Sequence, residues 1–111
     1  MSRILLLFAF LFSISVLVEA QTSLGGKIVD NESGEVIIGA TVLLKRSGVQ
    51  TDGTITDEYG NFYFSSVAPG KYDVHITYTG YAPVIVTNVD VFNGKANKLP
   101  VTKLDTETKL L

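Results

Sequence analysis

Apolar and polar residues alternate along most of the chain after residue 20, with the two-residue period of half-buried β-strands. The segment 71–79 shows this alternation most clearly, because polar residues separate its apolar ones throughout. One face of the predicted strand carries the apolar residues Tyr72, Val74, Ile76 and Tyr78. Glycine, proline, asparagine and aspartate interrupt the pattern at short intervals, which predicts strands joined by tight turns.

The same criteria predict further strands at 24–30, 40–45, 53–56, 61–65, 84–91 and 99–104. The alternation changes phase near Asn88, which predicts a bulge or a break there. Seven short strands at this spacing predict an all-β fold, a seven-stranded antiparallel β-sandwich. Its expected core is Ile28, Val42, Leu44, Phe62, Phe64, Tyr72, Val74, Ile76, Val89, Val91, Leu99 and Val101. We expect one domain over residues 21–104, and a tail over 105–111 that frays.

The first twenty residues follow a different pattern. Arg3 precedes a nearly unbroken apolar run over 4–18, and Val18 and Ala20 stand three and one before the expected cut. This arrangement predicts a secretory signal peptide over residues 1–20, cleaved before Gln21. A membrane anchor is the alternative, but the run is shorter than the roughly 20 residues that span a bilayer. We therefore expect an exported chain without a transmembrane segment after cleavage.

Composition narrows the function classes further. The chain has no cysteine, which excludes a disulfide framework, a lipoprotein signal and thiolate metal sites. Nine basic residues against eleven acidic ones give a net charge of −2, and no basic patch is present. Nucleic acid is therefore not an expected partner.

Acidic residues fall in the predicted turns, where they have two interpretations. Asp57 can accept backbone N–H bonds within its turn. Alternatively it could bind calcium with Glu58, as could the cluster Asp30, Glu32 and Glu35, but the alternating ligand spacing of a calcium loop is missing. We therefore expect no cofactor or metal. We interpret six residues as structural turn formers: Asp30, Gly39, Asp57, Gly60, Gly70 and Gly80.

His75 is the only histidine, and it shares the outward strand face with Asp73. One histidine and one carboxylate are too few for a metal site. They are not a catalytic dyad either, because no nucleophile is placed beside them. We therefore predict no catalytic residue and no enzymatic activity. Three tyrosines at turns or on outward faces are candidate surface contacts, and they would suit a sugar ring: Tyr59, Tyr63 and Tyr81.

An ordered set of motifs covers nearly all of the chain after residue 20. The motif residues are Gly26, Ile28 and Asp30; Gly39, Ala40 and Val42; Thr56, Asp57, Gly60 and Phe62; Gly70 and Tyr72; and Gly80 and Tyr81. This series resembles the carboxypeptidase regulatory-like domain, which implies a transthyretin-like (prealbumin-like) seven-stranded sandwich. One departure lies at residues 36–38, where the family often has proline.

The resemblance implies a domain without catalytic residues of its own. Such domains stand beside the catalytic domain of some metallocarboxypeptidases. They also form the periplasmic N-terminal extension of TonB-dependent outer-membrane receptors. Because the chain stops at Leu111, about where a TonB box would begin, we expect a stand-alone or truncated relative of that extension.

Some motifs are shared with sandwiches of the collagen-adhesin B type. That likeness implies a Lys–Asn isopeptide bond assisted by a buried glutamate. Lys27 and Asn97 are present, but the position of the glutamate is occupied by Ile76. We therefore expect no such bond.

These observations predict a non-catalytic exported scaffold or interaction domain. Its partner would be an envelope protein or an adjacent receptor domain, in the periplasm, at the outer membrane or at the cell surface. A carbohydrate-binding module at the cell envelope is the alternative.

Overall fold

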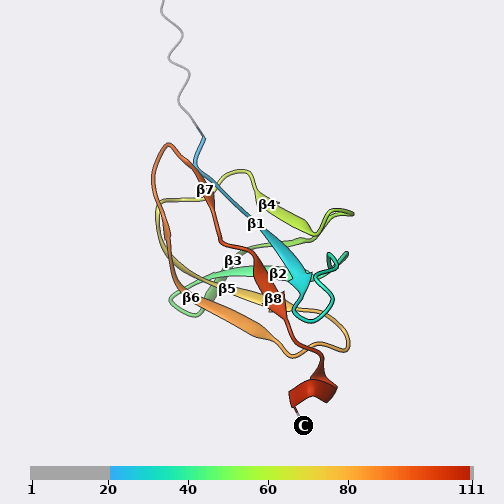
Figure 1. Ribbon diagram of the computed structural model, residues 1–111. Coiled ribbons are helices and arrows are strands. Elements are labelled where there is room, and N and C mark those ends of the chain that lie inside the picture. The colour runs from blue at the N-terminus through green and yellow to red at the C-terminus, as the bar shows by residue number, and fades with distance from the viewer. Residues whose placement is uncertain (1–20, 111) are drawn as a thin grey trace, which may run out of the picture.

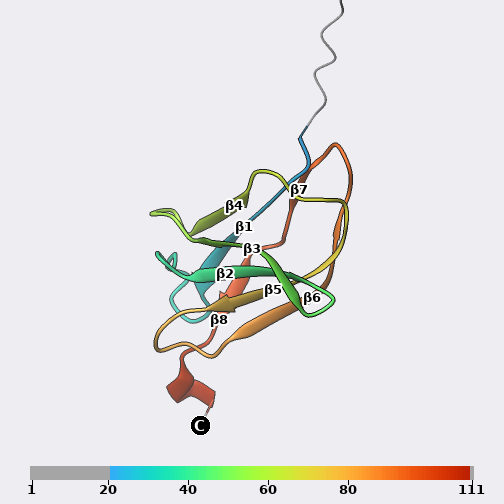
Figure 2. The same ribbon diagram turned by 180° about the vertical axis from the view of Figure 1, so that it is seen from behind.

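The computed structural model describes residues 21–110, so the signal peptide expected over residues 1–20 lies outside the described residues. The elements are β1 (Ser23–Asp30), β2 (Thr41–Arg46), β3 (Val49–Ile55), β4 (Asn61–Phe64), β5 (Gly70–Thr77), β6 (Val84–Val91), β7 (Ala96–Lys98), β8 (Thr102–Leu104) and the 3-10 helix η1 (Glu107–Leu110). β1 begins at one end of the sandwich and η1 lies at the other end (Figures 1 and 2).

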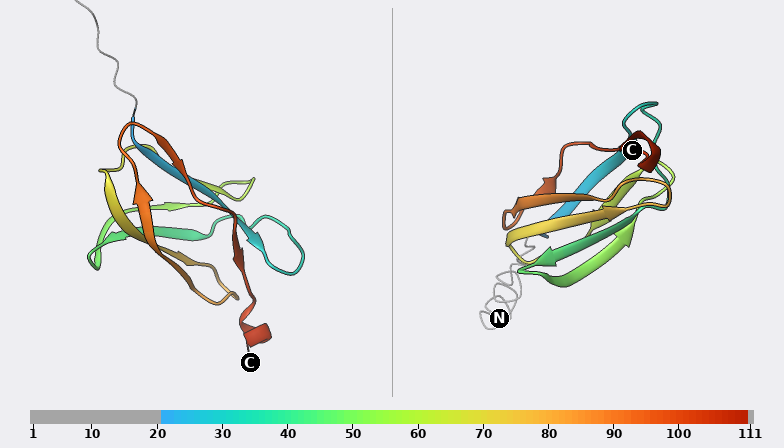
Figure 3. Two further views of the ribbon diagram at one scale, coloured as in Figure 1. Left: turned by 60° about the vertical axis from the view of Figure 1, so that its left-hand side comes forward. Right: turned by 90° about the horizontal axis from the view of Figure 1, so that it is seen from below.

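The strands form two sheets that pack face to face (Figure 1). In one sheet, β1 pairs with β4 on one side and with β7 and then β8 on the other. The second sheet has the order β3-β2-β5-β6, which the right-hand view of Figure 3 shows from below. The predicted all-β sandwich is therefore confirmed.

Two details of the predicted sandwich are wrong. β1 runs parallel to both β7 and β8, so the first sheet is mixed and not purely antiparallel. β7 follows β6, which belongs to the other sheet, so no hairpin fixes its direction beside β1. Residues 21–110 also hold eight strands instead of seven. The strand expected over 99–104 begins only at Thr102, because Pro100 has no N–H for the ladder, and β7 precedes it.

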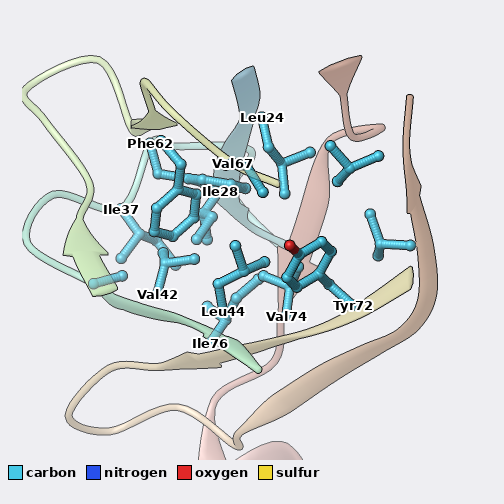
Figure 4. Close-up of a cluster of buried hydrophobic side chains, with 14 of the residues drawn as sticks. Leu24, Ile28, Ile37, Val42, Leu44, Phe62, Val67, Tyr72, Val74 and Ile76 are labelled. Atoms are coloured by element: carbon cyan, nitrogen blue, oxygen red, sulfur yellow. The ribbon is translucent and has the colours of Figure 1, made fainter. Parts of the chain in front are cut away.

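The core lies between the two sheets, as the close-up in Figure 4 shows. On β5 the alternation behaves as predicted, since Tyr72, Val74 and Ile76 are each at most 3% exposed. Gly26 of β1 faces the ring of Phe62, and a methyl group at Gly26 would overlap that ring. The absence of a side chain at Gly26 is therefore what admits Phe62 into the core.

The predicted core fails at the C-terminal strand. Val101 is 52% exposed and Leu99 is only partly buried, whereas Leu104 is fully buried. The break at Pro100 changes which residues face inward. An alternation that is continued across Pro100 therefore assigns the wrong residues to the core. The prediction also missed buried residues, some of them outside regular strands: Leu24, Val29, Ile37, Ala40 and Val67.

The edge strand β6 carries the irregularity that the sequence predicts. The register of β5 and β6 shifts between Tyr72 and Val74, and Asn88 has a positive φ of 56°. The backbone N–H of Asn88 donates to Asp73 Oδ1 at 3.3 Å. The bulge divides β6 into a regular first half and a distorted second half.

The segment after β8 does not fray at 105–107, contrary to expectation. The Ala82 N–H donates to the Asp105 carbonyl at 2.9 Å, and the Glu107 N–H donates to the Gly80 carbonyl at 3.0 Å. A bridge between Tyr81 and Thr106 lies between these bonds. The tail is therefore fixed against the Gly80 turn.

Candidate functional site

Asp57 organises the turn between β3 and β4. Its Oδ1 accepts the backbone N–H groups of Tyr59 and Asn61, both at 2.9 Å. Gly60 follows with φ 76°, and a Cβ there would come within 2.8 Å of the Ile28 carbonyl oxygen. Such a φ is strained for most other residues, so glycine is required at this position. The carboxylate of Asp57 thus stabilises a tight turn that packs against β1.

Thr56, directly before Asp57, holds the β1–β2 loop in place. Its hydroxyl donates to the Ile37 carbonyl at 2.6 Å and accepts the Ala40 N–H at 2.9 Å. Its own backbone exchanges two further bonds with Gly39 and Ala40. Thr56 is only 2% exposed. This role of Thr56 is not predicted from the sequence, where its only indication is a hydroxyl side chain next to the turn aspartate.

Asp30 performs a similar role in the turn after β1. Its Oδ1 accepts the N–H groups of Glu32 at 2.8 Å and Ser33 at 2.9 Å, and its Oδ2 accepts the Tyr81 hydroxyl at 2.7 Å. The bond from the Ser33 backbone, followed by that from Tyr81, lowers the pKa of Asp30 from 3.8 to about 2. The bond to Asp30 in turn raises the pKa of Tyr81.

Tyr81 is therefore less exposed than the sequence predicts. It is half-buried, packs against the core, and bridges the β5–β6 connection to the Asp30 turn. The remaining predicted turn glycines, Gly39, Gly70 and Gly80, have positive φ values of 80°, 152° and 87°.

The acidic and imidazole side chains that the structure describes are not gathered into a metal site. Within residues 21–110, no group of three His, Asp or Glu side chains is placed to hold an ion. His75 lies on the outer face of the second sheet, between Leu43 of β2 and Ile85 of β6. Asp73, on the same face, contacts the bulge at Asn88.

The groups considered for an isopeptide bond lie apart. Asn97 is paired with Leu24 of β1, three residues before Lys27. The Asn97 amide donates to the carbonyls of Ser23, Phe92 and Lys95, and its oxygen accepts the Phe92 N–H at 2.9 Å. Asn97 thus stabilises the β6–β7 turn.

Tyr59 and Tyr63 are exposed, at 64% and 60%. Tyr59 stands on the Asp57 turn, whereas Tyr63 stands on the outer face of β4 opposite Gly25 of β1. Beside Tyr63 lies a shallow hollow of about 300 Å³, bounded also by Gly25, Asn61 and Lys98. The two rings thus stand on different parts of the surface, and only Tyr63 borders this hollow.

Comparison with known protein families identifies the family to which this β-sandwich belongs. The family described as the carboxypeptidase regulatory-like domain matches residues 23–104. The chain belongs to the carboxypeptidase regulatory-like domain family. The predicted resemblance to that family is therefore confirmed, and its residues 23–104 include all eight strands.

This carboxypeptidase regulatory-like domain spans only part of the length of two proteins that it resembles. Human carboxypeptidase D is 29% identical over 98 residues, which is 88% of this chain and 7% of that protein. A chain of a type II cohesin–X-dockerin complex from Acetivibrio cellulolyticus is 27% identical with a TM-score of 0.62, over 75% of this chain and 56% of that chain.

An enzyme also shares the fold. The 5-hydroxyisourate hydrolase of Klebsiella pneumoniae is 23% identical with a TM-score of 0.57, over 74% of this chain and 90% of that chain. At this identity the likeness shows a common fold alone.

Within residues 21–110, no helix has the length and hydrophobicity needed to cross a membrane.

Proposed function

We propose that this domain is a non-catalytic, exported interaction module that binds an envelope protein or a neighbouring receptor domain. The observation that carries the proposal is the set of apolar side chains standing outward from its strands. Tyr63 of β4 and Ile85 of β6 are each more than half exposed. Ile85 stands between Val84 and Val86, which are only partly buried, on one edge strand. Neighbouring exposed apolar side chains, unlike single scattered ones, are typical of surfaces that meet another protein.

Two further observations support this proposal. The family is a regulatory domain, and the cohesin–X-dockerin neighbour comes from a protein–protein complex. In addition, three polar residues of the sequence motifs form hydrogen bonds that stabilise the fold. Asp30, Thr56 and Asp57 each bond backbone groups that turns would otherwise leave unpaired.

We also propose the setting that the sequence suggests. The domain would be a relative of the N-terminal extension of TonB-dependent receptors, located in the periplasm, at the outer membrane or at the cell surface. The genomic sequence immediately downstream of Leu111 tests this setting. A plug and barrel encoded after this domain would support it, whereas unrelated sequence there would oppose it.

Capture from envelope extracts tests the binding function. The immobilised domain should retain an envelope protein, and the purified protein should bind the domain again in isothermal titration calorimetry. An unfolded preparation of the same chain is the control. Recovery of soluble glycans alone, or hydrolysis of peptides by the domain, would refute the proposal.

Carbohydrate binding is a second candidate, favoured by the hollow beside Tyr63. An exposed aromatic ring bordering a shallow surface with nearby amide and ammonium groups can stack on a sugar and bond its hydroxyls. Glycan binding on an array should then disappear in Tyr63→Ala and persist in Tyr59→Ala. Retention of binding in Tyr63→Ala would exclude this hollow as the site.

A further inference from the structure

The sandwich has several sheet edges, and they are not equivalent. An edge strand presents unpaired N–H and C=O groups that an extended peptide can join. Apolar surface beside the edge adds to the attraction, so the edge with uncovered apolar side chains is the best acceptor.

β3 and β4 are poor acceptors by this criterion. None of the β3 residues is buried, and the register of its pairing with β2 shifts between Leu44 and Lys45. Its two exposed apolar residues, Val49 and Ile55, stand at opposite ends of the strand, and the residues between them are polar, glycine or the charged Asp52. A strand added to β3 would therefore meet no alternating row of apolar side chains. On β4, Phe62 and Phe64 are already at most 3% exposed, so Tyr63 is the one large apolar side chain of this four-residue strand that an added strand could cover.

The edge formed by β7 and β8 is interrupted. Each of these strands has three residues, and Pro100 lies between them. A continuous ladder cannot form across a residue without an N–H.

β6 differs from the other edges. It ends its sheet and pairs there with β5 alone. Val84 and Val86 face the core but are only partly buried. Ile85 faces outward, is 54% exposed, and continues a row with His75 and Leu43 across the sheet. Both faces of this strand therefore offer apolar surface beside free backbone groups.

The usable part of β6 is its first half. Asn88 distorts the backbone, and Asp90 places a charge farther along the strand. Bulges and charges are features that discourage pairing at an edge. The residues before them, Val84 to Thr87, are uncharged.

We infer that Val84–Thr87 of β6 is the acceptor edge, and that its partner is an uncharged extended segment of another protein with apolar residues at alternate positions. Two side chains of this segment would cover Val84 and Val86, and one between them would meet Ile85. The inference rests on the proposed function and specifies its contact surface.

A second copy of the chain is a weaker occupant. A four-residue ladder between two copies would bury far less than the roughly 1,200 Å² that stable protein interfaces need. The bulge at Asn88 prevents the ladder from growing longer. A short contact of this kind is typical of a weak, transient complex, which suits a peptide segment of another protein better than a stable dimer.

Fluorescence anisotropy tests the inference with the full chain and a labelled peptide of alternating valine and threonine, with a lysine at each end. We expect Ile85→Lys to raise Kd at least tenfold. The matched control is Ile55→Lys on β3, since Ile55 is 64% exposed, and its Kd should stay within twofold of wild type. Hydrogen exchange should slow at residues 84–87 on peptide binding. Thermal unfolding of both variants checks that each is folded.

Three results would overturn the inference. The first is an absence of peptide binding, and the second is an equal loss of binding in both variants. The third is a concentration-dependent dimer, seen by sedimentation, that Ile85→Lys abolishes, because it would assign the edge to a second copy. If the captured envelope protein binds Ile85→Lys as well as wild type, the β6 assignment fails while the proposed function stands.

Discussion

Replacing Thr56 by valine should destabilise the domain through two hydrogen bonds and almost no change of shape. The substitution removes the hydroxyl that joins the Ile37 carbonyl to the Ala40 N–H. Ala40 is fully buried and Ile37 is 4% exposed, so water does not readily replace the lost partner. Each buried group left unpaired costs about 1–3 kcal/mol.

The expected loss for Thr56→Val is therefore about 2–6 kcal/mol, a large part of the roughly 5–15 kcal/mol by which small domains are stable. In thermal unfolding this corresponds to a fall in Tm of about 10–45 °C. Urea unfolding measures the free energy directly, and the slope m should remain unchanged because the same surface is exposed.

Thr56→Ser is the matched control, because it keeps the hydroxyl and removes only a methyl group. It should cost about 1 kcal/mol. Equal stability of the serine and valine variants, within about 0.5 kcal/mol, would refute the reasoning, since it would show that the hydroxyl bonds do not hold the loop.

Two further predictions concern packing and pH. Gly26→Ala should lower the free energy of unfolding by about 1–3 kcal/mol, because the methyl group overlaps the ring of Phe62; Gly25→Ala, whose Cβ meets nothing closer than 3.4 Å, is the control, and an equal effect in urea unfolding would contradict the account. Tyr81→Phe should raise the pKa of Asp30 from about 2 toward 3.8, measured by carboxyl NMR titration. Because the folded-state pKa is lowered, the stabilisation from Asp30 is present above pH 3.8 and is lost as pH falls toward 2, so the variant should begin acid unfolding at higher pH than wild type. An unchanged Asp30 pKa would show that the Tyr81 bond does not form.

Local pattern was sufficient for much of the fold. The alternation of Tyr72, Val74 and Ile76 identifies a half-buried strand, because successive side chains of a strand point to opposite faces of the sheet and only one face is buried. The phase change at Asn88 likewise reports a local event, the bulge. These features depend on residues that are neighbours in the sequence.

Features that depend on distant segments were not predictable in the same way. The parallel pairing of β1 with β7 and β8 depends on where the chain crosses between sheets, which no local pattern records. The alternating pattern places Val101 in the core only if it continues unbroken through Pro100, and the break at Pro100 ends that alternation. Thr56 and Tyr81 act through partners 19 and 51 residues away, so their roles were visible only in the structure.

Photo-crosslinking in cells tests the central claim most directly, namely that this domain works by binding a protein through its surface. A photoreactive amino acid would replace Ile85 in one variant and Ile55 in another, and mass spectrometry would identify the products. The account predicts a crosslink to one envelope protein from position 85 and little from position 55. Crosslinks to no protein from either position, together with binding of a glycan, would contradict it.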